Sequence, residues 1–194
     1  MSITCILSRI LERIVVKNSL YPLFTLSLND LPNAISFNNQ YAYRPTGSTS
    51  AAIISILQAI TDMLTVHQFV RVFAPYFTKA FDTVSRNSLF SKLSALPLDD
   101  NIYNWLASFS PDRCHFTNFN AAISEIAAIN SSIVQGSVLG PVAFCVASSD
   151  LNANFHGNTI KKYTDDSYLI VPDANSNTCQ SEIDGINSWA KKIT

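Results

Sequence analysis

Two adjacent carboxylates, Asp165 and Asp166, lie between apolar residues in the segment KKYTDDSYLIVP, residues 161–172. Residues 168–171 are typical of a strand, and a shorter strand ending at Tyr163 can pair with them as a hairpin. Two like charges at the tip of this hairpin repel each other, so their presence needs a reason. Either they form a polar turn, where Asp is favoured for local backbone reasons, or a divalent cation supplies the opposite charge.

Around this hairpin the sequence predicts a mixture of helices and strands. Residues 69–77 are rich in β-branched and aromatic side chains and predict a strand, although Pro75 cannot donate to a sheet ladder. Helices are predicted over residues 4–16, from a cap at 48–50 to about 64, over 85–96, over 99–109, after Pro141, and over 178–192. This order of elements indicates an α+β fold.

Two of these helices have apolar side chains that we expect to point inward. Residues 4–16 carry them opposite Arg9, Glu12 and Arg13. The expected inward side chains are Ile6, Leu7, Ile10, Leu11, Ile14 and Val15 in this helix, and Ile53, Ile54, Leu57 and Ile60 in the helix ending near residue 64. By contrast, we expect Lys161 and Lys162 to be solvated charges on a strand edge, where they discourage aggregation.

Composition limits the classes of protein that fit. The 194 residues are 47% hydrophobic, enough for a core, but only 14% charged, against about 25% in a usual soluble domain. We therefore expect part of the surface to be covered by something else. The net charge of −1 gives no global basic field for nucleic acid. No window reaches the roughly 20 apolar residues of a membrane span, and four scattered cysteines without a CxxC pair favour an intracellular setting, nuclear or cytoplasmic.

Five segments of the chain form an ordered set of motifs. The central three are FTKAFDTVS (77–85), QGSVLGPVAF (135–144) and YTDDSYLIV (163–171). In this order and at this spacing they resemble the reverse transcriptase domain of non-LTR (LINE-type) retrotransposons. They are similar to a family strand ending in Asp-Phe-Ser-Lys-Ala-Phe-Asp, then Gln-Gly-Ser-x-x-Gly-Pro, then Tyr-Ala-Asp-Asp. Upstream, SRILERIVVKNSLYP looks like the fingers region, and QYAYRPTGSTS looks like the family's Gln-x-x-Phe-Arg-x-x-x-Ser-Thr segment.

The resemblance implies a right-hand polymerase fingers–palm fragment, with a small antiparallel palm sheet packed on helices. Residues 1–68 would be partial fingers and fingers–palm helices, and 69–194 the palm with the Asp-Asp hairpin. The chain would begin inside the fingers and stop before the thumb. The implied partners are an RNA template, a DNA primer and dNTPs.

The implied chemistry is nucleotidyl transfer with two Mg²⁺ (or Mn²⁺) ions, which would explain the repelling carboxylates. Asp165 and Asp166 match the family's Asp pair, and Asp165 is the stronger candidate for metal ligand and catalytic residue. Tyr163 precedes the pair as in the family. Mg²⁺ favours carboxylate oxygens together with substrate phosphates.

Other residues carry over to nucleotide binding. Phe81 matches the aromatic residue under the incoming sugar, and Gln135 and Gly136 match the loop against the template base and nucleotide. Arg44, and less securely Lys79 of the motif, could contact phosphates. For Arg44, a plain surface charge is an equally good reading.

One departure decides what activity to expect. The family's first catalytic Asp lies three residues before the lysine that matches Lys79, and this chain has Tyr76 there, directly after Pro75. Tyrosine is neutral at pH 7 and cannot act as a bridging carboxylate, and we expect its ring to fill the space over the Asp pair. Asp82 lies six residues away, roughly 20 Å along an extended strand, too far to substitute.

These observations predict an RNA-directed DNA polymerase domain by descent, with little or no activity. Two alternatives remain open. One is a catalytically dead module that still binds nucleic acid. The other is a retrotransposon relic without molecular function, whose exposed palm surface would make it aggregate.

Overall fold

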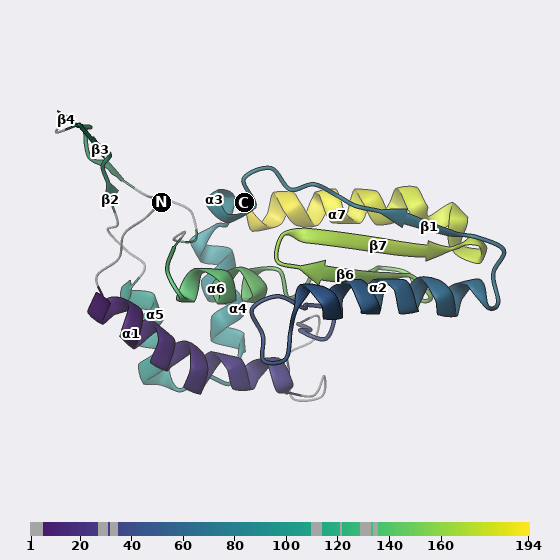
Figure 1. The fold of residues 1–194 in the computed structure, drawn as a ribbon, viewed down its shortest axis with the longest axis horizontal. Helices are drawn as coiled ribbons and strands as arrows, with labels where there is room; N and C mark the ends of the chain where they lie inside the picture. Colours follow the sequence, from purple (N-terminus) through teal and green to yellow (C-terminus); the bar gives the residue numbers. More distant parts are fainter. Residues whose placement is uncertain are drawn as a thin grey trace.

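The computed structural model describes residues 6–26, 31, 35–109, 114–120, 122–128, 133 and 136–194. Within them it confirms the predicted α+β architecture, a small antiparallel sheet packed on helices (Figure 1). In chain order the helices are α1 (Ile6–Val15), α2 (Thr49–Leu64), α3 (Ala80–Thr83), α4 (Arg86–Ala95), α5 (Asp100–Phe109), α6 (Leu139–Ala147) and α7 (Cys179–Ile193). A π-helical turn (Val16–Leu20) and a 3-10 turn (Tyr21–Thr25) follow α1, and a second 3-10 turn (Asp173–Thr178) precedes α7.

The central sheet has three strands in the order β1 (Val70–Phe73), β7 (Asp166–Pro172) and β6 (Thr159–Tyr163). Both pairings are antiparallel, with Phe73 opposite Leu169 and Tyr163 opposite Asp166. One face carries Leu169 and Val171 and packs against α7. Because side chains alternate along a strand, the fully buried Ile170 lies on the other face, where α2 contacts all three strands. The central strand β7 is therefore buried on both faces, whereas β1 at the edge is partly exposed.

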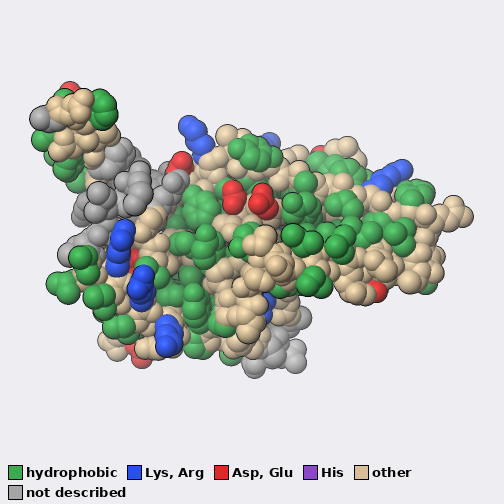
Figure 2. Space-filling view, viewed as in Figure 1, with side chains coloured by type: hydrophobic (Ala, Val, Ile, Leu, Met, Phe, Trp, Pro, Cys, Tyr) green, Lys and Arg blue, Asp and Glu red, His purple; other side chains and the backbone are tan. Residues whose placement is uncertain are grey.

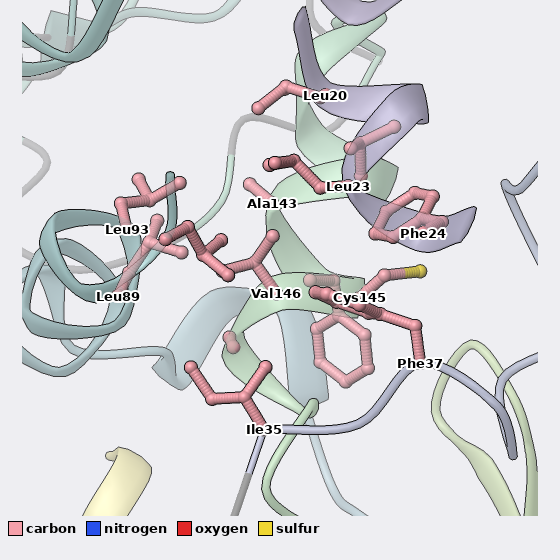
Figure 3. Close-up of a cluster of buried hydrophobic side chains, with 14 of the residues drawn as sticks. Leu20, Leu23, Phe24, Ile35, Phe37, Leu89, Leu93, Ala143, Cys145 and Val146 are labelled. Atoms are coloured by element: carbon pink, nitrogen blue, oxygen red, sulfur yellow. The ribbon is translucent and has the colours of Figure 1, made fainter. Parts of the chain in front are cut away.

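A second core surrounds α6, which is apolar almost all round its circumference. Its side chains meet residues from the turns after α1, from α4 and from the loop at residues 35–37, as Figure 3 shows for Leu20, Leu93 and Phe37 around Cys145 and Val146. A helix that is hydrophobic on all sides is stable only when it is enclosed. The helices and turns of this second core therefore pack around α6.

The predicted orientation of α1 is wrong for most of its apolar side chains, although Val15 is buried as expected. Its apolar side chains are largely exposed, Leu7 to 75%, whereas Glu12 is fully buried. The Glu12 carboxylate accepts hydrogen bonds from the backbone N–H groups of Val138 and Leu139, at 2.7 and 3.1 Å. These groups start α6, where N–H donors lack partners within the helix and the helix dipole favours an anion. Burial of this one carboxylate turns the apolar stripe of α1 outward.

The apolar side chains of helix α2 are likewise more exposed than the sequence predicted. Its predicted N-cap is confirmed, since the Ser48 hydroxyl accepts a hydrogen bond from the N–H of Ala51 at 3.0 Å. Its only fully buried side chain is Ala52, and Ile53, Ile54 and Leu57 are more than half exposed. Ile60, the fourth side chain predicted to point inward, is half-buried, so α2 turns most but not all of its predicted inward face toward solvent.

An arm of short strands at residues 114–128 is a feature that the sequence did not predict. It comprises β2 (Cys114–His115) paired with β5 (Ala127–Ala128), and β3 (Asn118–Phe119) paired with β4 (Ala122–Ile123). The arm projects from the body in Figure 1. Strands of two residues are too short to show a period-2 pattern, so the sequence carries little signal for them.

The predicted boundary between residues 68 and 69 falls in the loop between α2 and β1, and the division into fingers and palm stays a prediction. No helix in the described ranges is long and apolar enough to cross a membrane.

Candidate active site

The carboxylate pair lies at the tip of the β6–β7 hairpin, as the sequence predicted. Tyr163 and Asp166 are the last paired residues, so Thr164 and Asp165 form a two-residue turn between them. Asp165 is half-buried and Asp166 is exposed. Thr164 has a φ of +61°, a conformation that hairpin turns usually assign to glycine. For a β-branched residue this backbone costs about 1–3 kcal/mol and persists only where its surroundings enforce it.

The surroundings of the turn include a segment far away in sequence. The N–H of Lys162 donates to the carbonyl of Asn39 at 2.7 Å, and the N–H of Tyr41 donates to the carbonyl of Lys162 at 2.9 Å. Residues 39–41 thus continue the sheet beyond β6 as a short parallel bridge. The side chain of Gln40 accepts a hydrogen bond from the N–H of Thr164 at 3.1 Å.

The expectation that Lys162 is a solvated edge charge is wrong. Its side chain is 1% exposed, and its Nζ donates to the carbonyl oxygens of Ser148 at 2.6 Å and Leu151 at 3.0 Å. These carbonyls follow the last turn of α6, where the helix dipole favours a cation. Burial lowers the pKa of Lys162 to about 7. Lys161, its neighbour on the opposite side of the strand, is half-buried.

The segment that carries Tyr76 leaves the sheet before it reaches that residue. Strand β1 ends at Phe73, two residues before Pro75, which lacks the N–H that a ladder requires. Phe73 pairs with Leu169, so three further steps in register would bring Tyr76 opposite Asp166. Position 76 is therefore the place from which a side chain on an extended β1 would reach the hairpin tip.

Tyr76 does not fill the space over the Asp pair, contrary to expectation. It is 86% exposed. Its neighbour Phe77 points inward and packs its ring against Trp189, with centroids 5.5 Å apart. Because Pro75 ends the ladder, the chain turns Tyr76 toward solvent.

Phe81 is held against α6 rather than standing free. Its ring stacks on that of Phe144, with centroids 4.6 Å apart and planes 21° apart. Lys79, two residues earlier, is exposed with a φ of +54°, and its carbonyl accepts from the N–H groups of Asp82 and Thr83. The Lys79 side chain therefore stands at the start of α3, open to solvent.

Arg44 has a structural role in the loop before α2. Its Nη1 donates to the carbonyls of Phe37 at 2.8 Å and Gln40 at 3.2 Å. Gly136 is exposed with a φ of +86°, which glycine adopts without strain. Gln135 lies outside the described residues. The nucleotide contacts predicted for Arg44, Gln135 and Gly136 stay predictions.

Tyr43 is a residue near the site that the sequence reasoning did not single out. Burial raises its pKa, and the charges of Tyr163, Cys145 and Asp165 raise it further. Its phenol therefore stays protonated at neutral pH. Tyr43 stands at the aromatic position of the segment QYAYR, and this position was the sequence signal that could have identified it as a residue near the site. Tyr163 accepts a hydrogen bond at its hydroxyl from Thr49 at 3.2 Å.

Asp165 and Asp166 carry the type of oxygen donor that a divalent cation requires, and a cation at this pair stays a prediction. Within the described ranges, no group of three His, Cys, Asp or Glu side chains converges on one point. Mg²⁺ is commonly held by one or two carboxylates plus substrate phosphates and water. Asp165 and Asp166 supply this smaller set of oxygen donors.

Burial raises the pKa of Cys145 to about 12, so its thiol is not a nucleophile at neutral pH.

The family model for reverse transcriptase (RNA-dependent DNA polymerase) matches residues 1–194. The chain belongs to this family. No curated protein matches the sequence.

Two similar solved structures are telomerases from Candida tropicalis. The apo form, truncated from the C-terminal domain, has a TM-score of 0.64 and 12% identity, covering 94% of this chain and 38% of that one. The form in complex with the TWJ fragment of telomeric RNA has a TM-score of 0.67 and 12% identity, covering 97% and 32%. At this identity the likeness concerns the reverse transcriptase fold. The chain spans about a third of the length of these telomerases.

Proposed function

We propose that this chain is the fingers–palm part of a non-LTR retrotransposon reverse transcriptase that polymerises little or not at all. The observation that carries the proposal is the pair Asp165–Asp166 at the tip of the β6–β7 hairpin, in a member of the reverse transcriptase family whose neighbouring strand β1 ends short of position 76.

In this proposal Asp165 and Asp166 hold Mg²⁺ together with the phosphates of an incoming dNTP. The bound ion supplies charge neutralisation to the transferring phosphoryl group. Asp165 is the main ligand in this proposal, because it matches the first Asp of the family's pair and is half-buried, whereas Asp166 is exposed. Phe81, held flat on Phe144, limits the space beside the sugar. The stacking contact with Phe144 of α6 holds the Phe81 ring in this place before a nucleotide binds.

The proposed lack of activity rests on Tyr76. The phenol of Tyr76 is neutral at pH 7 and cannot replace the carboxylate that the family has at this position. Each 1.4 kcal/mol of lost transition-state stabilisation lowers a rate about tenfold. Because β1 ends at Phe73, position 76 is also displaced from the register that would carry a ligand to the hairpin. In this proposal the residue type at position 76 is the primary cause of the lost activity, and the early end of β1 is the competing cause that Tyr76→Asp tests.

Binding of nucleic acid without turnover is a second candidate, favoured by the surface of α1. Figure 2 shows a row of Lys and Arg side chains between hydrophobic ones over α1 and the π-helical turn after it, a segment in which Arg9, Arg13 and Lys17 recur every four residues. One similar telomerase is solved with telomeric RNA. We propose that this row contacts the backbone of an RNA template. Affinity for an RNA–DNA hybrid should then fall with added salt, and Arg13→Gln should reduce the salt slope by about one.

Metal binding tests the main proposal. We expect the full chain to bind Mn²⁺, followed by electron paramagnetic resonance, more tightly than its Asp165→Asn variant. Tyr76→Asp should tighten binding further, because a carboxylate at position 76, unlike the solvent-facing phenol, gains by turning toward an ion at the hairpin tip. Equal affinity in the unmodified chain, Asp165→Asn and Tyr76→Asp would show that the hairpin holds no metal.

A further inference from the structure

The hairpin turn that carries Asp165 is enforced from outside its own strands. Thr164 has a left-handed backbone that its β-branched side chain disfavours. Its N–H donates to Gln40 Oε1 at 3.1 Å. Gln40 comes from a loop more than a hundred residues away, so the hairpin sequence alone does not explain this conformation.

Gln40 is well placed to impose a fixed geometry. Its side chain is 2% exposed, and its Oε1 also accepts the N–H of Ala42 at 3.0 Å. Because both neighbours are donors, the amide oxygen must face them, and the amide cannot be flipped. Gln40 Nε2 is buried and has no hydrogen-bond partner among the described atoms. A buried donor left unpaired is disfavoured, so the two bonds to the oxygen must outweigh it.

The segment that carries Gln40 is itself anchored. Its backbone pairs with Lys162 on both sides, through the carbonyl of Asn39 and the N–H of Tyr41. The Lys162 side chain reaches from β6 to the end of α6, and Asn39 Nδ2 donates to the carbonyl of Leu151 and to Asn152 Oδ1. Gln40 therefore stands on a frame that joins the loop, β6 and α6.

We propose that Gln40 is a positioning residue for Asp165: by accepting the N–H of Thr164 it holds the turn left-handed, so that the Asp165 carboxylate stays at a fixed place on the hairpin tip. The part of this proposal that concerns metal affinity rests on the proposed function of the Asp pair. The part that concerns the backbone of Thr164 does not.

The test uses the full chain carrying Tyr76→Asp as parent, with Mn²⁺ as the probe. Gln40→Met removes the acceptor at nearly constant length, and we expect it to weaken Mn²⁺ binding about tenfold or more, as for other groups that orient metal ligands. The matched control is Gln58→Met on α2, whose amide donates to Asp62 on the exposed surface. Its Mn²⁺ affinity should equal that of the parent.

A second background separates positioning from a general loss of structure. Glycine adopts a left-handed backbone without strain. With Thr164→Gly in the parent, Gln40→Met should therefore weaken Mn²⁺ binding by less than about threefold. Equal losses with threonine and with glycine at position 164 would mean that Gln40 acts only through overall stability, and would overturn the proposal.

Nuclear magnetic resonance provides a readout that needs no metal. In the unmodified chain the carbon shifts of Thr164 should have left-handed values, and Gln40→Met should move them toward extended values while Gln58→Met leaves them in place. Thr164 staying left-handed in Gln40→Met overturns the proposal. A parent that binds no Mn²⁺ but shows this shift would contradict the proposed function and leave the positioning role supported.

Discussion

At the scale of single residues, Lys162 is a buried lysine whose amino group is satisfied by backbone carbonyls. Its ammonium group lies among backbone carbonyls at the end of α6. Burial lowers its pKa, nearby Cys145 and Asp150 oppose that shift, and Lys92 adds to it. Lys92 itself donates to the carbonyl of Ala147 and to Asp150, 2.5 Å away. Two lysines thus cap one helix end from different elements.

The pKa of Lys162 predicts a pH dependence of stability. In the folded chain the pKa is about 7, well below the usual value near 10.5. Between these values the unfolded chain binds a proton that the folded chain does not, so the free energy of unfolding rises with pH by up to about 1.4 kcal/mol per unit. Urea unfolding from pH 7 to 10 should show this rise relative to Lys162→Met. Lys161→Met is the control, and parallel curves for the unmodified chain and Lys162→Met would refute it.

At the scale of elements, α1 allows a comparison between its buried charge and its exposed apolar face. Glu12→Ala leaves the N–H groups of Val138 and Leu139 without their acceptor, which should lower the free energy of unfolding by about 1–3 kcal/mol for each group left unpaired. Leu7→Gln, on the exposed face, should change it by less than about 0.5 kcal/mol. Chemical denaturation measures both. A larger loss from Leu7→Gln would mean that α1 packs through its apolar stripe.

The same elements mark what could be predicted from the sequence. The β6–β7 hairpin and the placement of Asp165 and Asp166 were predictable, because an apolar strand pattern surrounds a short polar turn. The orientation of α1 was not, because periodicity identifies an apolar face but not the element that covers it. The burial of Lys162 was not either, since its acceptors lie on a remote helix end. Tyr76 turns outward because Pro75 ends the strand, and Pro75 is the sequence signal for this departure from the sheet.

At the scale of the whole molecule, two observations agree on an incompletely covered surface. Only 14% of the residues are charged. Large apolar side chains of α1, α2 and the 114–128 arm are exposed, including Leu7, Ile54 and Phe119. We expect the isolated chain to self-associate as its concentration rises, because exposed apolar area favours association. Sedimentation analysis should show less association for Leu7→Gln combined with Ile54→Gln. A strictly monomeric unmodified chain would contradict this expectation.

The most direct test of the account is primer extension on an RNA template with Mg²⁺ or Mn²⁺, comparing the unmodified chain with Tyr76→Asp. We predict no extension by the unmodified chain and extension by Tyr76→Asp, with Asp165→Asn in the same background silent again. That result would mean that one residue in the palm accounts for the loss of activity. Extension by the unmodified chain would contradict the account, because another carboxylate would then have to complete the site. Silence of both chains would contradict the central role of Tyr76 and assign the loss to the early end of β1 at Pro75 or to the rest of the polymerase.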